Sequence, residues 1–318
     1  MSGSAALIWI HALTPLRVGT DEGLGSINLP TMREVHTRHP IYPGSSLKGV
    51  LRAEIEAGDK RLARQLFGPD REHAGDHRGS LSFTDAHLIA LPVRSLYGTF
   101  AWCTSAFVLS RLERDRKAAG LGSLGLPKAY PKEDVALVTR ETQLVLGTEQ
   151  GKRVFVEQYT LKATDTPDIT GVALTLSQEI WPDDADARAL FVGRFAVLPD
   201  AIFDGLTQTA MEVRTRVCIN PETGTAEASG PWAEEAMPAE SLLAGLALGR
   251  STTVFESWEP DETAKTENKG KRKNEEELSG AVAMQRLAQK WPPTVLRLGG
   301  HNTVGMGRAK LRLVHGKE

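Results

Sequence analysis

Hydrophobic residues follow two periods along this chain, one typical of strands and one typical of helices. The apolar run at 5–14, closed by Thr14-Pro15, predicts a buried strand. After Ser45 or Ser46, either of which suits a helix cap, apolar residues recur at 47, 50, 51 and 55, which is one face of a helix. The same criteria predict helices at 60–67, within 92–116, at 238–248 and at 282–289, and strands at 80–86, 135–146, 154–162, 295–298 and 308–314.

A β-hairpin is predicted around the turn at 220–224. Its first arm, 212–219, alternates clearly, and its return arm runs through 226–232. The apolar row consists of Val213, Val217 and Ile219, and the basic row of Arg214 and Arg216. Such a row could act as a wedge between bases beside a phosphate-binding edge. Ordinary sheet packing produces the same alternation, and the pattern alone favours packing.

Two loops carry candidate function. Residues 17–43 show no periodicity, and a structureless loop of that length in a compact protein is usually functional, although a surface excursion without a role remains the alternative. Residues 299–307 hold four glycines between two predicted strands, which permits close backbone approach to a ligand. This pattern is neither a Walker A motif nor a dinucleotide fingerprint, and a tight strand connection explains it equally well.

The start of the helix near Ser45 could hold a phosphate. Its small-residue turn presents free backbone N–H groups and the positive end of a helix dipole. Lys48 lies in the first turn and Arg52 one turn later, where they could neutralise neighbouring phosphates. A capped core helix with exposed basic side chains would look the same, and the pattern does not separate the two interpretations.

A charged segment at 259–277 has 12 charged residues in 19 and no aromatic residue except at its margin. It cannot bury enough apolar surface to offset the entropy of ordering, so it is predicted to be a mobile insertion. Its basic run at 269–273 could touch RNA, but a solvated linker is favoured because mixed-sign charge runs usually stay in water.

Composition narrows the class of protein. The 318 residues are 41% hydrophobic and 25% charged, which is ordinary for a globular protein. A net charge of -2 excludes a globally basic nucleic-acid coat, so any nucleic-acid role needs local basic surface. No apolar run is long enough for a membrane helix, no leader pattern is present, and two cysteines make no disulfide scaffold. We therefore expect no membrane partner and a cytoplasmic location.

Several motifs follow one another along the chain in a characteristic order. They are Leu13-Thr14-Pro15-Leu16-Arg17-Val18-Gly19, Gly25-Ser26-Ile27-Asn28-Leu29-Pro30, Ile41-Tyr42-Pro43-Gly44-Ser45-Ser46-Leu47-Lys48-Gly49-Val50-Leu51-Arg52, Ser82-Phe83-Thr84-Asp85-Ala86, Ile219-Asn220-Pro221-Glu222-Thr223-Gly224, Glu234-Glu235-Ala236-Met237-Pro238 and the terminal glycine-rich loop. Together they resemble the RAMP superfamily of CRISPR effector proteins, most closely the repeated backbone subunit of the type III-B (Cmr) complex. The resemblance covers nearly the whole chain apart from the charged insertion.

The resemblance implies an α+β fold with a ferredoxin-like, RRM-type core. It implies a single RAMP domain over 1–318, with a long first loop, a thumb hairpin at about 205–238, helical insertions and a flexible charged insertion at about 259–280. The implied partners are CRISPR RNA, single-stranded target RNA, copies of the chain stacked in a filament, and other Cmr-complex subunits. The implied role of the thumb is to distort the guide–target duplex at regular intervals.

The resemblance also implies site residues. The residues expected to bind RNA are Arg38, Ser45, Ser46, Lys48, Arg52, Arg214, Arg216, His301 and Asn302. Active relatives carry an aspartate where Asn28 stands, and often a histidine where Arg17 stands; that aspartate is implied in endoribonuclease cleavage of target RNA with a divalent metal, Mg or Mn. An asparagine amide is neutral and a much poorer partner for such a cation. The expected activity is therefore absent or weakened, with Glu234 and Glu235, and also Asp21, Glu22 and Glu34, as acids that could partly substitute.

Two other functions remain as alternatives. A RAMP-type endoribonuclease that processes precursor CRISPR RNA would cut repeat RNA without partners. A small-molecule enzyme would use the glycine-rich loop to bind a nucleotide phosphate; the basic helix, the thumb-like hairpin and the absent Walker pattern argue against it.

Overall fold

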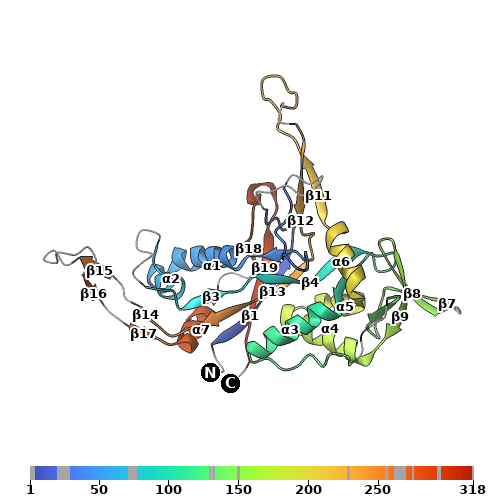
Figure 1. The fold of residues 1–318 in the computed structure, drawn as a ribbon, viewed down its shortest axis with the longest axis horizontal. Coiled ribbons are helices and arrows are strands. Elements are labelled where there is room, and N and C mark those ends of the chain that lie inside the picture. The colour runs from blue at the N-terminus through green and yellow to red at the C-terminus, as the bar shows by residue number, and fades with distance from the viewer. Residues whose placement is uncertain are drawn as a thin grey trace.

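A long mixed sheet runs through the molecule, with helices packed along it (Figure 1). The computed structural model describes residues 4–19, 29–70, 77–128, 130, 133–148, 151–227, 230–254, 257–260, 270–273, 276–291 and 295–316. The helices are α1 (Gly44–Gly58), α2 (Lys60–Phe67), α3 (Ala106–Ala118), α4 (Pro167–Ile180), α5 (Ala185–Arg194), α6 (Asp200–Thr209) and α7 (Gly280–Gln289). The strands are β1 (Ala5–Ala12), β2 (Ile41–Tyr42), β3 (Leu81–Phe83), β4 (Ala86–Arg94), β5 (Phe100–Ser105), β6 (Val135–Val138), β7 (Val145–Thr148), β8 (Gly151–Val156), β9 (Tyr159–Asp165), β10 (Phe195–Leu198), β11 (Glu212–Arg216), β12 (Trp232–Ala236), β13 (Leu242–Gly249), β14 (Thr252–Val254), β15 (Ser257–Pro260), β16 (Gly270–Lys273), β17 (Glu276–Leu278), β18 (Val295–Arg297) and β19 (Arg308–Val314).

One part of the sheet has a ferredoxin-like arrangement. The strands β19, β1, β13 and β4 neighbour one another in that order, and each neighbouring pair is antiparallel. Helix α1 lies in the connection from β1 to β4, and α7 in the connection from β13 to β19, which is the βαββαβ chain order of that fold. The predicted α+β class with an RRM-type core is confirmed.

Strand β13 replaces a helix predicted at 238–248, and that prediction was wrong. The segment Leu-Leu-Ala-Gly-Leu-Ala-Leu lies between β1 and β4 and is buried on both faces, which removes the alternation that marks most strands. Gly245 is needed there, because a Cβ at this position would lie 3.0 Å from the carbonyl oxygen of Asp85.

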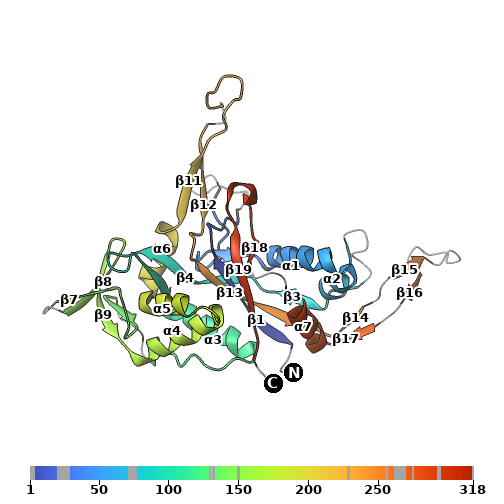
Figure 2. The same cartoon turned by 180° about the vertical axis from the view of Figure 1, so that it is seen from behind.

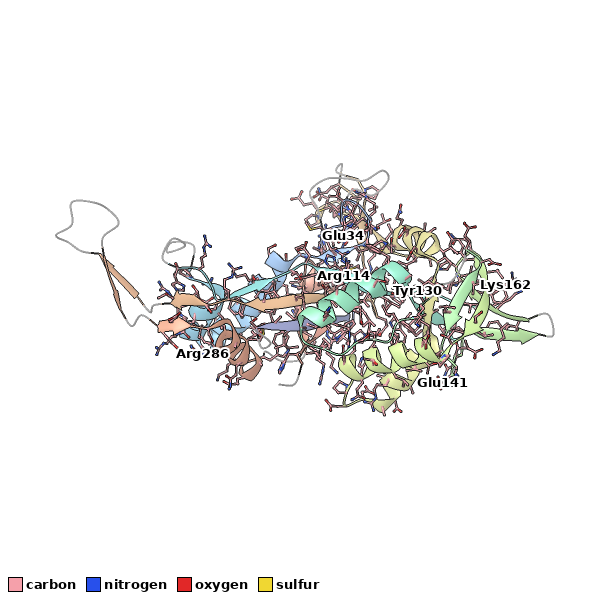
Figure 3. The ribbon with its side chains drawn as sticks, turned by 60° about the horizontal axis from the view of Figure 1, so that its bottom comes forward. Glu34, Arg114, Tyr130, Glu141, Lys162 and Arg286 are labelled. Atoms are coloured by element: carbon pink, nitrogen blue, oxygen red, sulfur yellow. The ribbon has the colours of Figure 1, made fainter. Side chains whose placement is uncertain are left out.

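Beyond β4 the sheet continues through a second group of strands. Its order there is β5, β10, β6, β9, β8 and β7, and helices α3, α4, α5 and α6 belong to the same stretch of chain. The range 92–116 was predicted as a loop with a helix; the loop is present only at 95–99, between the end of β4 and the unpredicted strand β5, and α3 follows as predicted. The aromatic rings of Trp102, Trp181 and Phe191 meet with centroids 5.2–6.0 Å apart and fill the core here. Arg286 on α7 and Lys162 on β9 lie at opposite ends of the molecule (Figure 3).

Two hairpins leave the body of the molecule. Strands β11 and β12 pair antiparallel from Glu212↔Ala236 to Arg216↔Trp232, and the bridge Ile219↔Ala226 continues the hairpin outward (Figures 1 and 2). Residues 205–209 belong to α6, which leads into it. The second arm is formed by β14 with β17 and β15 with β16, where the mobile insertion was predicted; 261–269 lie outside the described residues. In the part of the chain that the structure describes, no helix is long and apolar enough to cross a bilayer.

Candidate functional site

Three segments far apart in the sequence meet at the carboxylate of Glu234. This residue on β12 is 2% exposed, and its Oε2 lies 2.6 Å from Arg216 Nε of the same hairpin. The same oxygen lies 3.2 Å from His301 Nε2 in the glycine-rich loop and 3.8 Å from Arg17 Nε in the first loop. Its Oε1 accepts a hydrogen bond from Trp232 Nε1 at 2.8 Å. One buried anion therefore joins the hairpin, the first loop and the terminal loop.

The cluster around Glu234 joins two arginines to one carboxylate, so it carries a net positive charge even when His301 is neutral. Burial raises the pKa of Glu234, but the Trp232 hydrogen bond and the charges of His301, Arg216 and Arg17 outweigh it, so the pKa is lowered. Glu234 is thus held ionised and cannot act as a proton donor at neutral pH. The side chains of Arg17 and Arg216 remain partly exposed, at 13% and 24%.

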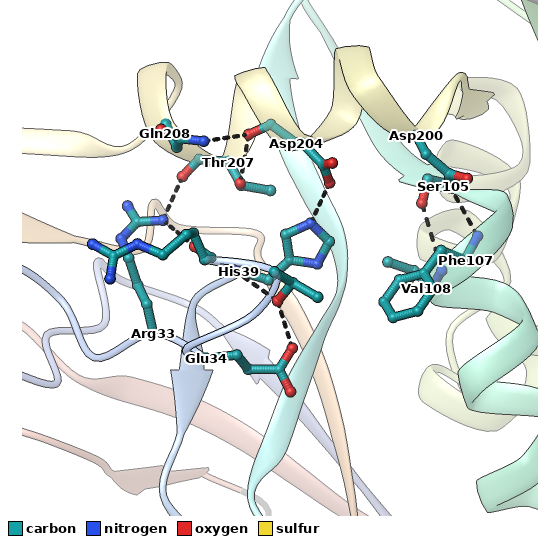
Figure 4. Close-up of polar contacts among 12 residues, drawn as sticks. Arg33, Glu34, His39, Ser105, Phe107, Val108, Asp200, Asp204, Thr207 and Gln208 are labelled. Carbon is teal, nitrogen blue, oxygen red and sulfur yellow. Dashed lines mark hydrogen bonds and ion pairs between the residues drawn. The ribbon is translucent and has the colours of Figure 1, made fainter.

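Glu235, the next residue on β12, points to the other face and pins the first loop. Its Oε1 lies 2.6 Å from Arg33 Nη2 and its Oε2 accepts the backbone N–H of Thr31 at 2.9 Å. Both side chains of the ion pair are nearly buried, at 6% and 3% exposure. Arg33 also donates to the carbonyl of Thr207 at the end of α6 (Figure 4). The exit of the first loop is therefore fixed to the base of the hairpin.

A second polar group fixes the turn that follows. Glu34 receives a two-pronged hydrogen bond from Arg111 on α3, at 2.9 and 2.6 Å, and one from the Thr37 hydroxyl at 2.6 Å. Burial raises the pKa of Glu34, but these hydrogen bonds and the charges of His87 and Arg111 lower it to about 2. His39 Nε2 lies 2.7 Å from Asp204 Oδ1 on α6 (Figure 4). These contacts fix the position of the turn, and they commit the Glu34 carboxylate to a structural role.

The glycine-rich loop packs directly on the first loop. The N–H of Gly300 donates to the carbonyl of Arg17 at 3.0 Å, and that of Gly307 to the carbonyl of Pro15 at 2.9 Å. Gly299 has a φ of 73°, and a Cβ there would lie 2.1 Å from the Arg17 carbonyl oxygen. The glycines are thus required by close packing between backbones, which makes this a tight connection as well as a candidate binding loop.

The start of α1 lies beside the same loop. The Tyr42 side chain hydrogen-bonds with the backbone of Gly299, and burial, which outweighs this bond, raises its pKa to about 12. The helix begins at Gly44, whose N–H donates to Asp85 Oδ1 at 2.8 Å, with Pro43 in the cap position. The prediction that Ser45 or Ser46 caps the helix was therefore wrong; both lie exposed in its first turn. That turn has no acidic residue of its own, and the Asp85 carboxylate already occupies the Gly44 N–H.

Lys48 adds positive charge to this end of α1. It is half-buried, and burial together with the charges of Arg52 and Arg250 lowers its pKa. Arg52 Nη1 donates to the carbonyl of Pro69 at 2.9 Å and its Nε lies 3.4 Å from Glu56, so this side chain is partly engaged within the protein. Lys48 is the freer of the two to meet a ligand.

The hairpin carries its apolar row in solvent. Val213, Val217 and Ile219 are 52%, 45% and 52% exposed. Packing against the core, which the alternation alone favoured, is excluded as the explanation of this row. Arg214 Nε lies 2.5 Å from Glu212, and both are accessible, so Arg214 stands apart from the Glu234 cluster.

Other predicted site residues differ in how they relate to the cluster. Asn302 begins a short 3-10 turn and its Nδ2 donates to the Gly299 carbonyl at 3.3 Å, beside His301. Arg38 is exposed at the turn after Glu34, with a positive φ of 60°, and is separated from the cluster by that turn.

Asn28, the predicted catalytic position, lies outside the described residues, as do Asp21 and Glu22. Its neighbour Leu29 pairs with Glu234 in a parallel bridge.

The residues described here do not fit a divalent metal. No three His, Cys, Asp or Glu side chains among them gather closely enough to hold one. Leu29 pairs with β12, whose two carboxylates, Glu234 and Glu235, are both paired with arginines. These two side chains therefore offer a cation few free oxygen ligands.

Sequence patterns did not reveal several residues of this site. Arg33, Thr31 and Tyr42 act through contacts with segments distant in sequence, which local spacing does not predict, although Tyr42 belongs to the motif at 41–52. Trp232 acts within its own strand, on Glu234 two residues along, and no pattern marked it. Arg250, which follows β13 and lies near Lys48, was hidden by the wrong helix prediction for that segment.

This fold has known counterparts. The family model of the RAMP superfamily matches residues 9–310. The chain belongs to the RAMP superfamily, as the motifs in its sequence predicted.

Within that superfamily the chain is similar to Cmr4. It is 33% identical over 251 residues to the CRISPR system Cmr endoribonuclease Cmr4 of Pyrococcus furiosus, which spans 77% of this chain and 81% of that protein. The crystal structure of oligomeric Cmr4 from Pyrococcus furiosus covers 99% of both chains at 24% identity and a TM-score of 0.67. A second crystal structure of Cmr4 covers 98% of this chain and all of the other, at 26% identity and a TM-score of 0.65. A chain of the type III-B Cmr-beta complex bound to cognate target RNA shares the fold, with a TM-score of 0.67 at 19% identity over 97% of this chain and 96% of the other.

Proposed function

We propose that this chain is the CRISPR-RNA-binding backbone subunit of a type III-B (Cmr) effector complex. In this role copies stack along the guide RNA, and the β11–β12 hairpin acts as a thumb that distorts the guide–target duplex. Other Cmr subunits and single-stranded target RNA are the further partners. The similarity to Cmr4 and to a chain of a Cmr complex bound to target RNA supports this assignment.

The observation that carries the proposal is the convergence at Glu234. The first loop, the hairpin and the glycine-rich loop contribute Arg17, Arg216 and His301 to one buried carboxylate. A single anion holds three nitrogen groups, so the cluster retains positive charge that a phosphate can meet. The exposed apolar row lies on the hairpin face opposite Glu234 and Arg216, and its residues Val217 and Ile219 extend outward past Arg216, where a base could be displaced against them.

The α1 start supplies the second group of phosphate contacts in this proposal. Ser45 and Ser46 lie in the first turn, with Lys48 one step further, and Tyr42 ties this end of the helix to Gly299. Backbone N–H groups and the helix dipole favour an anion here, and Lys48 neutralises it. An RNA strand bound both at the Glu234 cluster and at the start of α1 would run alongside strands β19 and β1.

Target cleavage is proposed to be weak in this chain. Active relatives would use a divalent metal, Mg or Mn, which supplies charge stabilisation at the scissile phosphate. Asn28 gives no carboxylate for such an ion, and Glu234 and Glu235 are held by arginines. We therefore assign this chain to holding target RNA rather than to cutting it.

Co-purification with RNA tests the proposal. The tagged chain is expressed in cells that produce Cmr subunits and guide RNA, and the bound RNA is sized and sequenced. We expect a discrete small RNA with a repeat-derived end, and affinity that falls steeply with salt. The Lys48→Gln variant should carry less RNA, whereas Lys60→Gln, at an exposed lysine at the start of α2, should match the unaltered chain. Absence of RNA would refute the proposal, and cutting of repeat RNA by the isolated chain would favour a precursor-processing enzyme instead.

A further inference from the structure

One face of the C-terminal hairpin carries four cations, with the exposed Val295 among them opposite Lys310. Strands β18 and β19 pair antiparallel, with Arg297 directly opposite Arg308. Along β19 the side chains of Ala309 and Leu311 are buried, while the alternate positions are accessible to different degrees. The residues on this accessible face, called the basic strip below, are Arg297, Arg308, Lys310 and Arg312.

The basic strip has no acidic partner within the described part of the chain. Elsewhere in this protein arginines pair with carboxylates, as Arg33 does with Glu235 and Arg116 with Glu179. No ion pair joins a strip side chain to a described carboxylate, and the nearby acid Glu240 contacts His11 instead, at 2.7 Å. Two like charges directly opposite on paired strands destabilise a sheet. With a net charge of only -2, the chain has enough acids to pair them, so the unpaired row calls for an external anion.

The strip lies next to the proposed RNA site. The glycine-rich loop that carries His301 is the turn of this same hairpin, and it lies beside the base of β11 and β12 in both views (Figures 1 and 2). On the inner side the neighbours on β1 are Trp9 and His11, which are buried; His11 meets Trp181 edge-on at 5.1 Å. The strip therefore forms the open margin of that face, continuous with the loop.

The geometry suits an extended polyanion. Alternate residues of a strand are about 6.7 Å apart, so the three β19 cations form a straight row held by a rigid sheet. Guanidinium groups bind phosphate oxygens through paired hydrogen bonds. We infer that the basic strip binds phosphates of a single-stranded RNA and extends the RNA path beyond the glycine-rich loop. This inference rests on the proposed function and adds a contact surface to it.

The test compares salt dependence of RNA binding. The probe is a labelled single-stranded RNA with a repeat-derived end and a mixed-sequence spacer, bound to the purified full chain. In the double variant Arg308→Gln/Lys310→Gln the slope of log affinity against log salt should fall by about 1.4, since each phosphate contact of a single strand contributes about 0.7. The matched control is Lys152→Gln/Lys162→Gln on β8 and β9, distant strands where each lysine pairs with an exposed aspartate (Figure 3 labels Lys162). Arg297→Gln, at an exposed position, provides a second strip variant, expected to lower the slope by about 0.7.

Each outcome decides between the two proposals. An unchanged slope in both strip variants, with a lowered slope in Lys48→Gln, would overturn the strip and leave the proposed function standing. Loss of self-association in sedimentation, without any change in RNA binding, would mean that the strip meets an acidic surface of a second copy, which also overturns it. No RNA binding by the unaltered chain would refute the proposed function itself.

Discussion

Glu234 and His301 lie 3.2 Å apart, Oε2 to Nε2, one on strand β12 and the other in the loop between β18 and β19. Arg216 and Arg17 share the same carboxylate oxygen. A buried anion with three nitrogen partners stabilises the site by holding three segments that would otherwise repel one another. This arrangement predicts that the site depends on Glu234 for its assembly.

Replacing the Glu234 carboxylate should lower the stability of the protein without lowering its affinity for RNA. Glu234→Gln should lower the free energy of unfolding by about 3 kcal/mol, because the cations lose a buried counter-charge. At temperatures where the variant remains folded, its RNA affinity should not fall, since the phosphate-binding cations are still present. Urea unfolding and RNA titration measure the two quantities. Glu212→Gln, which removes an accessible partner of Arg214, is the control and should change stability by at most about 0.5 kcal/mol. A stable Glu234→Gln variant would contradict the assigned role.

The exposed apolar row of the hairpin (Val213, Val217 and Ile219) predicts a variant that changes RNA distortion but not stability. Val217→Ser should leave the free energy of unfolding within about 0.5 kcal/mol, because the side chain is 45% exposed and packs on little. It should weaken the distortion of a guide–target duplex, because an apolar wedge has been removed. Fluorescence of a base analogue at successive target positions measures that distortion.

The control for this prediction is an exposed valine outside the hairpin. Val35→Ser, at a position 91% exposed in the turn after Arg33, should change neither stability nor the fluorescence pattern. If Val217→Ser unfolds the protein, the row packs more than its exposure indicates. If the fluorescence pattern stays unchanged, the hairpin does not act as a wedge.

Local patterns predicted those parts of the fold in which one face alone is buried. Helices α1, α2 and α7 follow clear periods, so their ranges were predicted closely. The hairpin and its turn were also predicted, but the return arm expected at 226–232 overlaps β12 (Trp232–Ala236) only at residue 232. Strand β13 was mistaken for a helix because burial on both faces erases its alternation, and α4, α5 and α6 were not predicted at all.

The candidate site likewise combines residues that local motifs predicted with contacts that they did not. Ser45, Lys48 and His301 belong to local motifs and were found from sequence. The contacts of Glu234 with Arg17 and His301 depend on pairing between distant strands, which no local spacing encodes. Glu34 was considered as a substitute acid, yet the fold commits it to Arg111. Sequence thus marked the candidate binding segments, while their convergence on Glu234 required the structure.

The Glu34 network predicts a specific dependence on pH. The folded pKa is lowered to about 2 from 4.5, so the carboxylate adds stability above pH 4.5 and loses it as the pH falls towards 2. Urea unfolding between pH 7 and pH 3 should show this loss in the unaltered chain. Glu34→Gln should be less stable at pH 7 by about 3 kcal/mol, since Arg111 loses its buried partner, and its own decline below pH 4.5 should be shallower. Parallel declines in the two proteins would show that Glu34 does not carry the dependence.

A carboxylate at position 28 should give this chain metal-dependent endoribonuclease activity on bound target RNA. Asn28→Asp adds an oxygen ligand of the kind that Mg²⁺ or Mn²⁺ prefers, next to Leu29, which pairs with Glu234 at the base of the hairpin. We expect metal-dependent cleavage at regular spacing within the guide-paired region, abolished by a chelator, with unchanged guide binding. Asn220→Asp, which adds the same group at the hairpin turn, is the control and should not cut. Denaturing gels of end-labelled target RNA measure the products. If assembled complexes with Asn28 already cleave as fast as the Asn28→Asp variant, position 28 is not the catalytic position, and another group in the chain performs the reaction.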